Sequence, residues 1–149
     1  DLIDAGAMAP GASATVGVAI GTQTLYDRLG APVFNFQPVS VTHDAYAIGA
    51  YEHFVGINSA IVIDLLGQGY AELTPKGLMS GPGGAPDFAR GARLSRGGRS
   101  IVALLSSARG GSVSRIVPRL GADDIVGLSR LDIDTVVTEH GVAWLTNAR

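Results

Sequence analysis

The amino-acid sequence predicts an α/β fold in which a mixed β-sheet is flanked by helices. Short apolar runs bounded by turn residues recur along the 149 residues and alternate with segments suited to helices. The Gly67-Gln68-Gly69 turn between two such runs predicts a hairpin, so one strand pair is antiparallel. Hydrophobic residues make up 46% of the chain and charged residues 16%, which favours a buried sheet over a disordered chain.

The first half of the chain contains alternating helices and strands. We expect three helices, at Asp1–Ala9, at Gln23–Leu29, and from Thr42 or His43 through Ala50. We expect five strands, at Thr15–Ile20, Pro32–Val39, Phe54–Asn58, Ala60–Leu66 and Tyr70–Leu73. The alternation in the second of these is typical of a strand with one buried face, whereas the apolar third and fourth are typical of fully buried strands.

The second half begins with a glycine-rich stretch, Ser80–Gly98, which continues into a helix near Pro86. Four strands are expected after it, at Ser100–Leu105, Val113–Val117, Ile125–Leu128 and Asp134–Thr138, and Val142–Leu145 is predicted to begin a helix. The length suits one domain, residues 1–149. Its uncapped start and the lack of a closing element predict a domain truncated at both ends.

The composition limits the cellular compartment and the classes of binding partner that we expect for this protein. Cysteine is absent, which excludes disulfides, thiolate metal sites and a cysteine nucleophile. No apolar run has membrane-spanning length and no signal peptide is visible, so we expect a cytoplasmic protein without membrane contact. Residues 1–75 carry seven acids and one base, and residues 76–149 carry ten bases and six acids. This polarity steers anions, but aromatic residues do not interleave with the arginines, so nucleic acid is not expected.

The glycine-rich stretch is the candidate binding site. Glycine permits a close approach of backbone N–H groups to a ligand, and the first turn of a helix attracts anions. Four arginines follow at Arg90, Arg93, Arg96 and Arg99. The pattern predicts a site for a negatively charged group; the structural alternative is a tight turn leading into a solvated basic helix.

Several segments together resemble the C-terminal domain of the acetyl-CoA hydrolase/transferase family. The matching segments run in order along nearly the whole chain: Gly21-Thr22, Leu25–Asp27, Gly56–Ala60, Asp64-Leu65, Gly67-Gln68, Gly83–Ala92, Ser95–Ile101, Val113–Pro118 and Asp134–Ala143. The resemblance implies the CoA-transferase type of α/β fold (NagB/RpiA/CoA-transferase type). It also implies chemistry on acyl-CoA thioesters with coenzyme A as substrate.

The family mechanism uses a glutamate carboxylate that attacks the thioester and passes through an acyl-glutamyl anhydride and a glutamyl-CoA thioester. The resemblance makes the backbone N–H of Gly84 the donor to the oxyanion. It places the catalytic glutamate upstream of Asp1, in a preceding part of the protein, so this chain alone is expected to be inactive. Glu139 lies in a family motif, and we expect it to be structural or to line the site.

The expected CoA-binding residues are Gly83, Gly84, Asn58 and His43, with Arg90 and Arg93 as candidates for the phosphates because they follow the glycine loop most closely. His43 stands where many members carry asparagine, and His140 where tyrosine or glutamine is usual. The histidines lack metal-ligand spacing, so no metal is expected. No G-x-S-x-G elbow is present, which argues against a serine hydrolase.

Three functions follow from these observations. The first is part of an acyl-CoA:carboxylate CoA-transferase that takes acyl-CoA and a small carboxylate. The second is an acyl-CoA (acetyl-CoA) hydrolase of the same family, and the third a non-catalytic CoA-binding or scaffold subunit. Apolar surface at a cut domain edge predicts a homo-oligomer.

Overall fold

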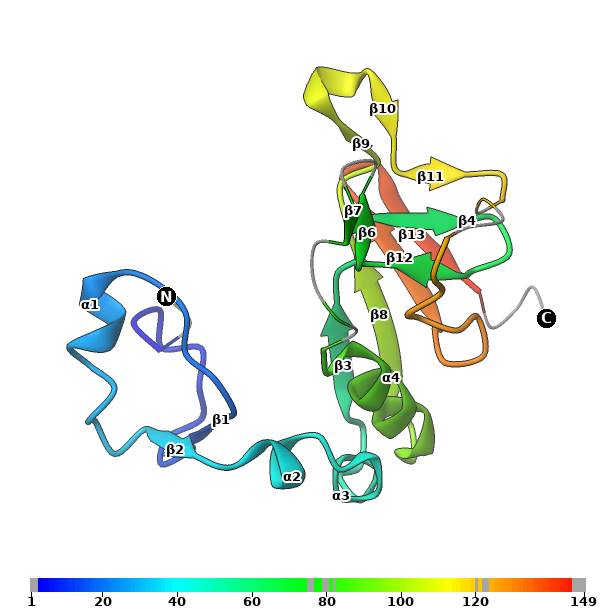
Figure 1. Ribbon diagram of the computed structural model, residues 1–149. Helices are drawn as coiled ribbons and strands as arrows, with labels where there is room; N and C mark the ends of the chain where they lie inside the picture. Colours follow the sequence, from blue (N-terminus) through cyan, green and yellow to red (C-terminus); the bar gives the residue numbers. More distant parts are fainter. Residues whose placement is uncertain are drawn as a thin grey trace. The chain divides into compact units, whose positions relative to one another are not determined.

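The computed structural model describes residues 3–74, 77–78, 81, 83–119, 121 and 124–145, in two compact units, residues 1–42 and 43–149 (Figure 1). Asp1 and Leu2 of the first predicted helix, and Ser80 and Pro82 of the glycine-rich stretch, lie outside the described residues. No helix in the described ranges combines the length and the apolarity that a membrane span requires.

The first unit is built on a short parallel pair of strands, β1 (Ala14–Val16) and β2 (Phe34–Phe36). Two single-turn helices accompany them, α1 (Gln23–Tyr26) and α2 (Val39–Thr42). The predicted helix at Asp1–Ala9 is wrong for its described part, because residues 3–6 form a turn in which Gly6 has a φ of 66°. A left-handed residue cannot continue a right-handed helix.

The second unit contains the main sheet, which has the strand order β13-β12-β8-β3. Its strands are β3 (Val55–Asn58), β8 (Arg99–Ala103), β12 (Thr135–Thr138) and β13 (Gly141–Trp144). The first three are parallel, whereas β12 and β13 form an antiparallel hairpin, so the predicted mixed sheet is confirmed (Figure 1).

The helix predicted to begin at Val142 is wrong, because these residues form β13. Gly141 has a φ of 144°, which lets the chain reverse immediately after β12. Val142 then pairs with Val137, and Trp144 pairs with Thr135. A four-residue apolar run is ambiguous by itself, and β-branched and aromatic residues suit a paired strand.

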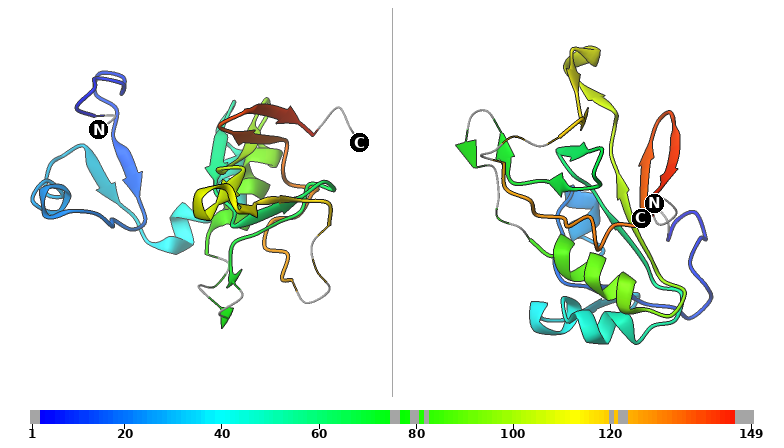
Figure 2. Two further views of the ribbon diagram at one scale, coloured as in Figure 1. Left: turned by 90° about the horizontal axis from the view of Figure 1, so that it is seen from above. Right: turned by 90° about the vertical axis from the view of Figure 1, so that its right-hand side faces the viewer.

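Two helices pack together beside the main sheet. α4 (Ala85–Leu94) contacts β3 and β8, and α3 (Ala45–Gly49) packs on α4 (Figure 2). The carboxylate of Asp44 caps α3 by accepting the backbone N–H groups of Tyr46 and Ala47 at 2.8 and 3.3 Å. Small residues allow close contact: a β-carbon on Gly56 would meet the carbonyl oxygen of Phe88 at 3.2 Å.

A second, smaller mixed sheet has the order β11-β4-β5. It contains β4 (Val62–Asp64), β5 (Gly69–Tyr70) and β11 (Ile116–Val117). Two further strand pairs are β6 (Leu73–Thr74) with β7 (Gly77–Leu78), and β9 (Ser107–Ala108) with β10 (Val113–Ser114). The hairpin predicted around residues 67–69 is confirmed, because β4 and β5 pair antiparallel across that turn.

Several predicted strands differ from the structure. Thr15–Ile20 is a strand only at its start, in β1, and Val39 at the end of the predicted Pro32–Val39 strand begins α2. Tyr70–Leu73 divides between β5 and β6. Val113–Val117 divides into β10 and β11 at Arg115, whose guanidinium turns inward and donates to the carbonyl oxygens of Ile61, at 2.7 Å, and Ala60. Among the residues that the structure describes, Ile125–Leu128 contributes one bridge, from Leu128 to Gly69. The main core lies between the two sheets and α4, and it contains Ala60, Ile63, Ala89, Val102, Leu104, Leu128, Ile133 and Val136.

Candidate functional site

The glycine turn before α4 leaves two backbone donors unused. Gly84 is the N-cap of the helix, and its carbonyl oxygen accepts the N–H groups of Asp87 and Phe88, each at 3.1 Å. Across the described ranges of the chain, the N–H groups of Gly84 and Ala85 donate no hydrogen bond. Donors at the positive end of a ten-residue helix are suited to an anion or to a carbonyl oxygen that becomes one.

Two other predicted site residues, Asn58 and His43, lie beside this turn. The Asn58 side chain extends from the end of β3 and donates to the carbonyl oxygen of Ala85 at 3.4 Å. The His43 imidazole lies against Gly84, since a β-carbon built there would overlap Nε2 and Cδ2 of the ring. The structure therefore brings Asn58, His43, Gly83 and Gly84 together around the start of α4.

The arginines of the basic run are not equivalent. Nη1 of Arg93 donates to the carbonyl oxygen of Leu131 at 3.0 Å and to Oδ1 of Asp132 at 3.2 Å. Arg96 pairs with Glu52, and the guanidinium carbon of Arg99 lies 4.9 Å from the centre of the Trp144 ring. Arg90 is exposed on α4, and it makes no ion pair with any described residue. Of the two predicted phosphate ligands, Arg90 is the one whose charge is uncommitted.

The carboxyl ends of the parallel strands gather further polar groups. Ser106 follows β8 and Glu139 follows β12, and these strands are neighbours in the sheet. The Glu139 carboxylate accepts the Ser106 N–H at 2.8 Å and the Ser106 hydroxyl at 2.7 Å. These hydrogen bonds to Ser106, aided by the neighbouring His140, lower the pKa of Glu139 to about 2.

The Ser106–Glu139 pair was not predicted from the sequence. Both residues follow predicted strands, Ser100–Leu105 and Asp134–Thr138, and in a parallel sheet the carboxyl ends of neighbouring strands share one edge. The sequence does not show that these two strands, β8 and β12, are neighbours, because residues paired between them, such as Ile101 and Thr135, lie far apart in the chain.

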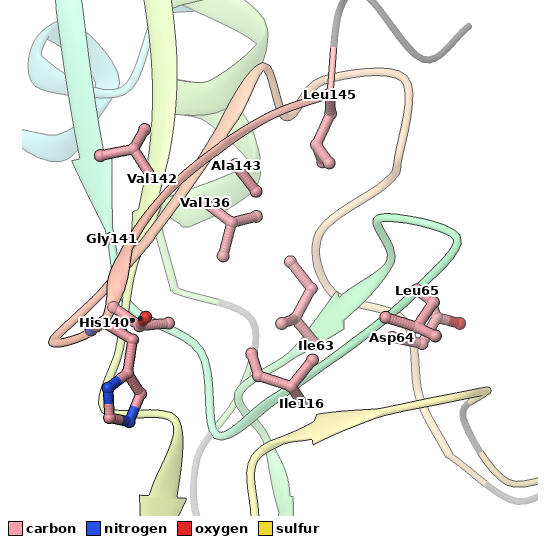
Figure 3. A pocket seen from close by; sticks show the side chains of 11 residues that line it. Ile63, Asp64, Leu65, Ile116, Val136, His140, Gly141, Val142, Ala143 and Leu145 are labelled. Atoms are coloured by element: carbon pink, nitrogen blue, oxygen red, sulfur yellow. Dashed lines mark hydrogen bonds between the residues drawn. The ribbon is translucent and has the colours of Figure 1, made fainter.

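A cavity of about 350 Å³ lies between the β12–β13 hairpin and the second sheet (Figure 3). Its walls are mostly apolar: Val136, Ala143 and Leu145 lie on the hairpin side, and Ile63 and Ile116 on the other. His140 stands at the hairpin turn, and Asp64 lies at the far side, where its carboxylate accepts the N–H groups of Leu66 and Gln68. The sequence did not predict this cavity, because its walls come from three separate segments, residues 63–65, Ile116 and residues 136–145.

No group of three or more potential metal ligands is found among the described residues. None of the three histidines lies within such a group, and the carboxylates near the site serve as hydrogen-bond acceptors. The arrangement offers backbone donors, an amide, an imidazole and a carboxylate around the carboxyl edge of a parallel sheet, which is where α/β proteins bind their ligands.

Comparison with known proteins identifies the class as CoA-transferase-like α/β domains. Residues 21–149 match the family described as "Acetyl-CoA hydrolase/transferase C-terminal domain". The chain belongs to this family, and the resemblance found in the sequence is confirmed.

The similar proteins of known name are CoA-transferases. The chain is 42% identical over 127 residues to 4-hydroxybutyrate coenzyme A transferase of Clostridium kluyveri, covering 85% of this chain and 30% of that protein. It is 40% identical over 133 residues to butyryl-CoA:acetate CoA-transferase of Anaerostipes caccae, covering 87% and 30%. The chain therefore spans just under a third of the length of these relatives.

Solved structures confirm the fold. RipA from Yersinia pestis aligns with a TM-score of 0.80 and 38% identity, covering 89% of this chain and 30% of that one. A 4-hydroxybutyrate CoA-transferase from Porphyromonas gingivalis aligns with a TM-score of 0.69 and 36% identity, covering 89% and 30%. The predicted CoA-transferase-type α/β fold is therefore correct.

Proposed function

We propose that this chain is the C-terminal part of an acyl-CoA:carboxylate CoA-transferase that moves coenzyme A from an acyl-CoA to a small carboxylic acid. Family membership and the names of the relatives support the class of reaction. The observation that carries the proposal is the Gly84 N–H, which no described residue uses and which begins a helix at the carboxyl edge of the sheet.

The chemistry requires a nucleophile from outside residues 1–149. In the proposed cycle a glutamate carboxylate oxygen attacks the thioester carbonyl carbon, the C–S bond breaks, and CoA thiolate leaves an acyl-glutamyl anhydride. The thiolate then attacks the glutamyl carbonyl, which releases the acyl group as a carboxylate and forms a glutamyl-CoA thioester. The acceptor carboxylate repeats both steps in reverse, so charge and atoms balance without a redox cofactor.

Gly84 acts in this cycle where the attacked carbonyl oxygen becomes negative. A backbone N–H already directed at that position stabilises the oxyanion without reorganisation, and removal of one such donor typically costs about a hundredfold or more in kcat. Asn58 supports the donor by holding the Ala85 carbonyl. Arg90 is the proposed ligand for a phosphate of CoA, since its guanidinium has no ion-pair partner in the described chain.

The remaining parts of the proposal concern the complete protein. The relatives are more than three times as long as the matched segment, which leaves room for an N-terminal domain that supplies the glutamate. We further propose that the complete protein is a homo-oligomer, in which exposed apolar strands of this domain are covered.

A substrate-exchange assay tests this function. The complete natural gene product is incubated with acetyl-CoA and butyrate, 4-hydroxybutyrate or succinate in turn, and every CoA species is followed by mass spectrometry. A transferase produces the acyl-CoA of the added acid at the expense of acetyl-CoA. Free CoA that accumulates at the same rate with and without acid would replace this proposal with a hydrolase. CoA binding with no turnover would replace it with a binding or scaffold subunit.

A further inference from the structure

The His43 imidazole occupies the space beside Gly84 that a side chain would need. A β-carbon at Gly84 would overlap two ring atoms, Nε2 and Cδ2, and would lie 3.3 Å from Cε1. The same ring meets the Phe88 ring edge to face, with centroids 5.1 Å apart and planes at 80°. His43 therefore fills a gap between the glycine turn and the first turn of α4.

The two glycines of the turn are required for different physical reasons. Gly83 has a φ of 56°, and a β-carbon there would meet nothing within 4 Å, so only its backbone conformation favours glycine. Gly84 has a φ of −90° and a ψ of −1°, a conformation that any L-residue adopts. What excludes a side chain at Gly84 is the imidazole of His43.

The contacts of His43 extend into the sheet. Phe88 stacks on Phe54 with ring centroids 6.3 Å apart and planes at 28°, and Phe54 immediately precedes β3. The other end of β3 carries Asn58, which holds the Ala85 carbonyl at 3.4 Å. The first turn of α4 is therefore fixed on two sides, by the ring of His43 and by the amide of Asn58, while the N–H groups of Gly84 and Ala85 stay unbonded within the described chain.

We propose that His43 is a positioning residue, whose ring packs on Gly84 and Phe88 and thereby fixes where the Gly84 N–H points. His43 and Gly84 are a matched pair: the ring needs the absence of a side chain, and the turn needs the ring. The part of this inference that concerns catalysis rests on the proposed function, in which the Gly84 N–H meets the oxyanion. The part that concerns packing does not.

A double-mutant cycle in the complete gene product tests the pair, using G84A, H43A and the double variant H43A/G84A. Thermal midpoints and steady-state CoA-transfer kinetics are measured for each. We expect G84A to lower the midpoint by several degrees and H43A/G84A to recover most of that loss, because the alanine methyl then occupies the space left by the ring. If G84A does not fold, recovery of folded protein in the double variant is the same result.

The matched control is the neighbouring glycine. G83A should lower the thermal midpoint of the natural protein by the same amount as it lowers the midpoint of H43A. G83N should lower the midpoint less than G83A does, because asparagine tolerates the left-handed conformation. Equal coupling of H43A to Gly83 and Gly84, or no coupling to either, would overturn the proposal, because His43 would then not be paired specifically with Gly84.

The kinetic measurement separates positioning from simple stability. H43A should lower kcat by about a hundredfold at temperatures where it is fully folded, while the KM for acyl-CoA changes little, because misplacement of a catalytic group by about 1 Å acts on the transition state. An unchanged kcat in folded H43A would overturn the positioning role. If no variant, including the natural protein, transfers CoA, the proposed function fails, and the midpoints still decide whether His43 and Gly84 are coupled.

Discussion

The hydroxyl and the N–H of Ser106 both bind the carboxylate of Glu139, at 2.7 and 2.8 Å. Both hydrogen bonds stabilise the charged form, so the pKa of Glu139 falls from an ordinary value of 4.5 to about 2. A carboxyl group whose pKa is lowered by folding stabilises the folded protein at pH values above its pKa in the unfolded chain. This contribution is lost as the pH falls from about 4.5 towards 2.

Replacement of Ser106 by alanine removes the hydroxyl donor and keeps the backbone donor. We expect the pKa of Glu139 in S106A to rise towards 4.5 while remaining below it. Titration of the Glu139 side-chain carboxyl resonance by NMR measures this change, with S107A as the control at the neighbouring serine. The same carboxyl pKa in S106A and in the natural protein would show that the hydroxyl does not set it.

The arginines of α4 give a second comparison between single residues. Arg90→Ala should raise the KM for acyl-CoA about tenfold, which matches the loss of one charge-assisted hydrogen bond. Arg93→Ala should change that KM much less, because Arg93 already binds Asp132 and the Leu131 carbonyl. The arginine of the Arg93–Asp132 pair is exposed, so the pair contributes about 1 kcal/mol or less to stability. A larger KM effect in R93A than in R90A would contradict this assignment.

At the scale of helices and strands, the close contact of α3 with α4 requires a glycine, Gly91. A β-carbon on Gly91 would lie 2.5 Å from Cγ2 of Ile48 and 3.3 Å from the Ala45 carbonyl oxygen. Alanine has the better helix propensity by about 1 kcal/mol, but overpacking of a tight contact costs about 1–3 kcal/mol. The steric cost is therefore the larger of the two.

Gly91→Ala is accordingly expected to destabilise the protein, with a net loss of up to about 2 kcal/mol in the free energy of unfolding. Equilibrium denaturation in urea measures this loss. The double variant I48A/G91A serves as the control, because alanine lacks Cγ2 of isoleucine, the atom that the new methyl would meet most closely. I48A/G91A should therefore lose less stability than the sum of the two single losses. A stabilised G91A would mean that helix propensity outweighs the contact with α3.

The sequence predicted most elements of the second unit because their local chemistry agrees with their final environment. Residues 100–104 alternate between buried and partly buried positions, although Leu105 is exposed, and Asp44 caps α3 close to the predicted helix start. The errors have physical reasons. Val142–Leu145 is too short for periodicity to separate strand from helix, and residues 125–127 are apolar but find no strand partner within the described part of the chain.

Residues of the candidate site could be predicted only where a single segment of the sequence contains the whole motif. Gly83 and Gly84 followed from a local motif, and Asn58 from its family segment. The contacts His43–Gly84 and Ser106–Glu139 join residues 41 and 33 positions apart, so they depend on strand order and helix packing, which local patterns do not contain. Local sequence thus predicted the glycine turn, whereas the tertiary structure shows which side chains pack around it.

For the whole molecule, the notable surface is one face of the main sheet, which carries exposed apolar side chains. Ile57 is 67% exposed and Trp144 is 51% exposed, although both lie in the sheet. Parallel strands are usually covered on both faces. Because the matched segment covers only 30% of these relatives, we expect other parts of the complete protein to cover this face and to bring the nucleophile to Gly84.

Trapping the covalent intermediate tests whether Gly84 serves a glutamate from outside this chain. The complete gene product is incubated with acetyl-CoA, any enzyme-bound thioester is reduced with borohydride, and the modified peptide is located by mass spectrometry. We predict one reduced glutamate N-terminal to Asp1, with trapping strongly diminished in G84A. Modification of Glu52, Glu72 or Glu139, or turnover of acetyl-CoA without any trapped residue, would contradict the claim that this domain supplies an oxyanion donor to an external glutamate.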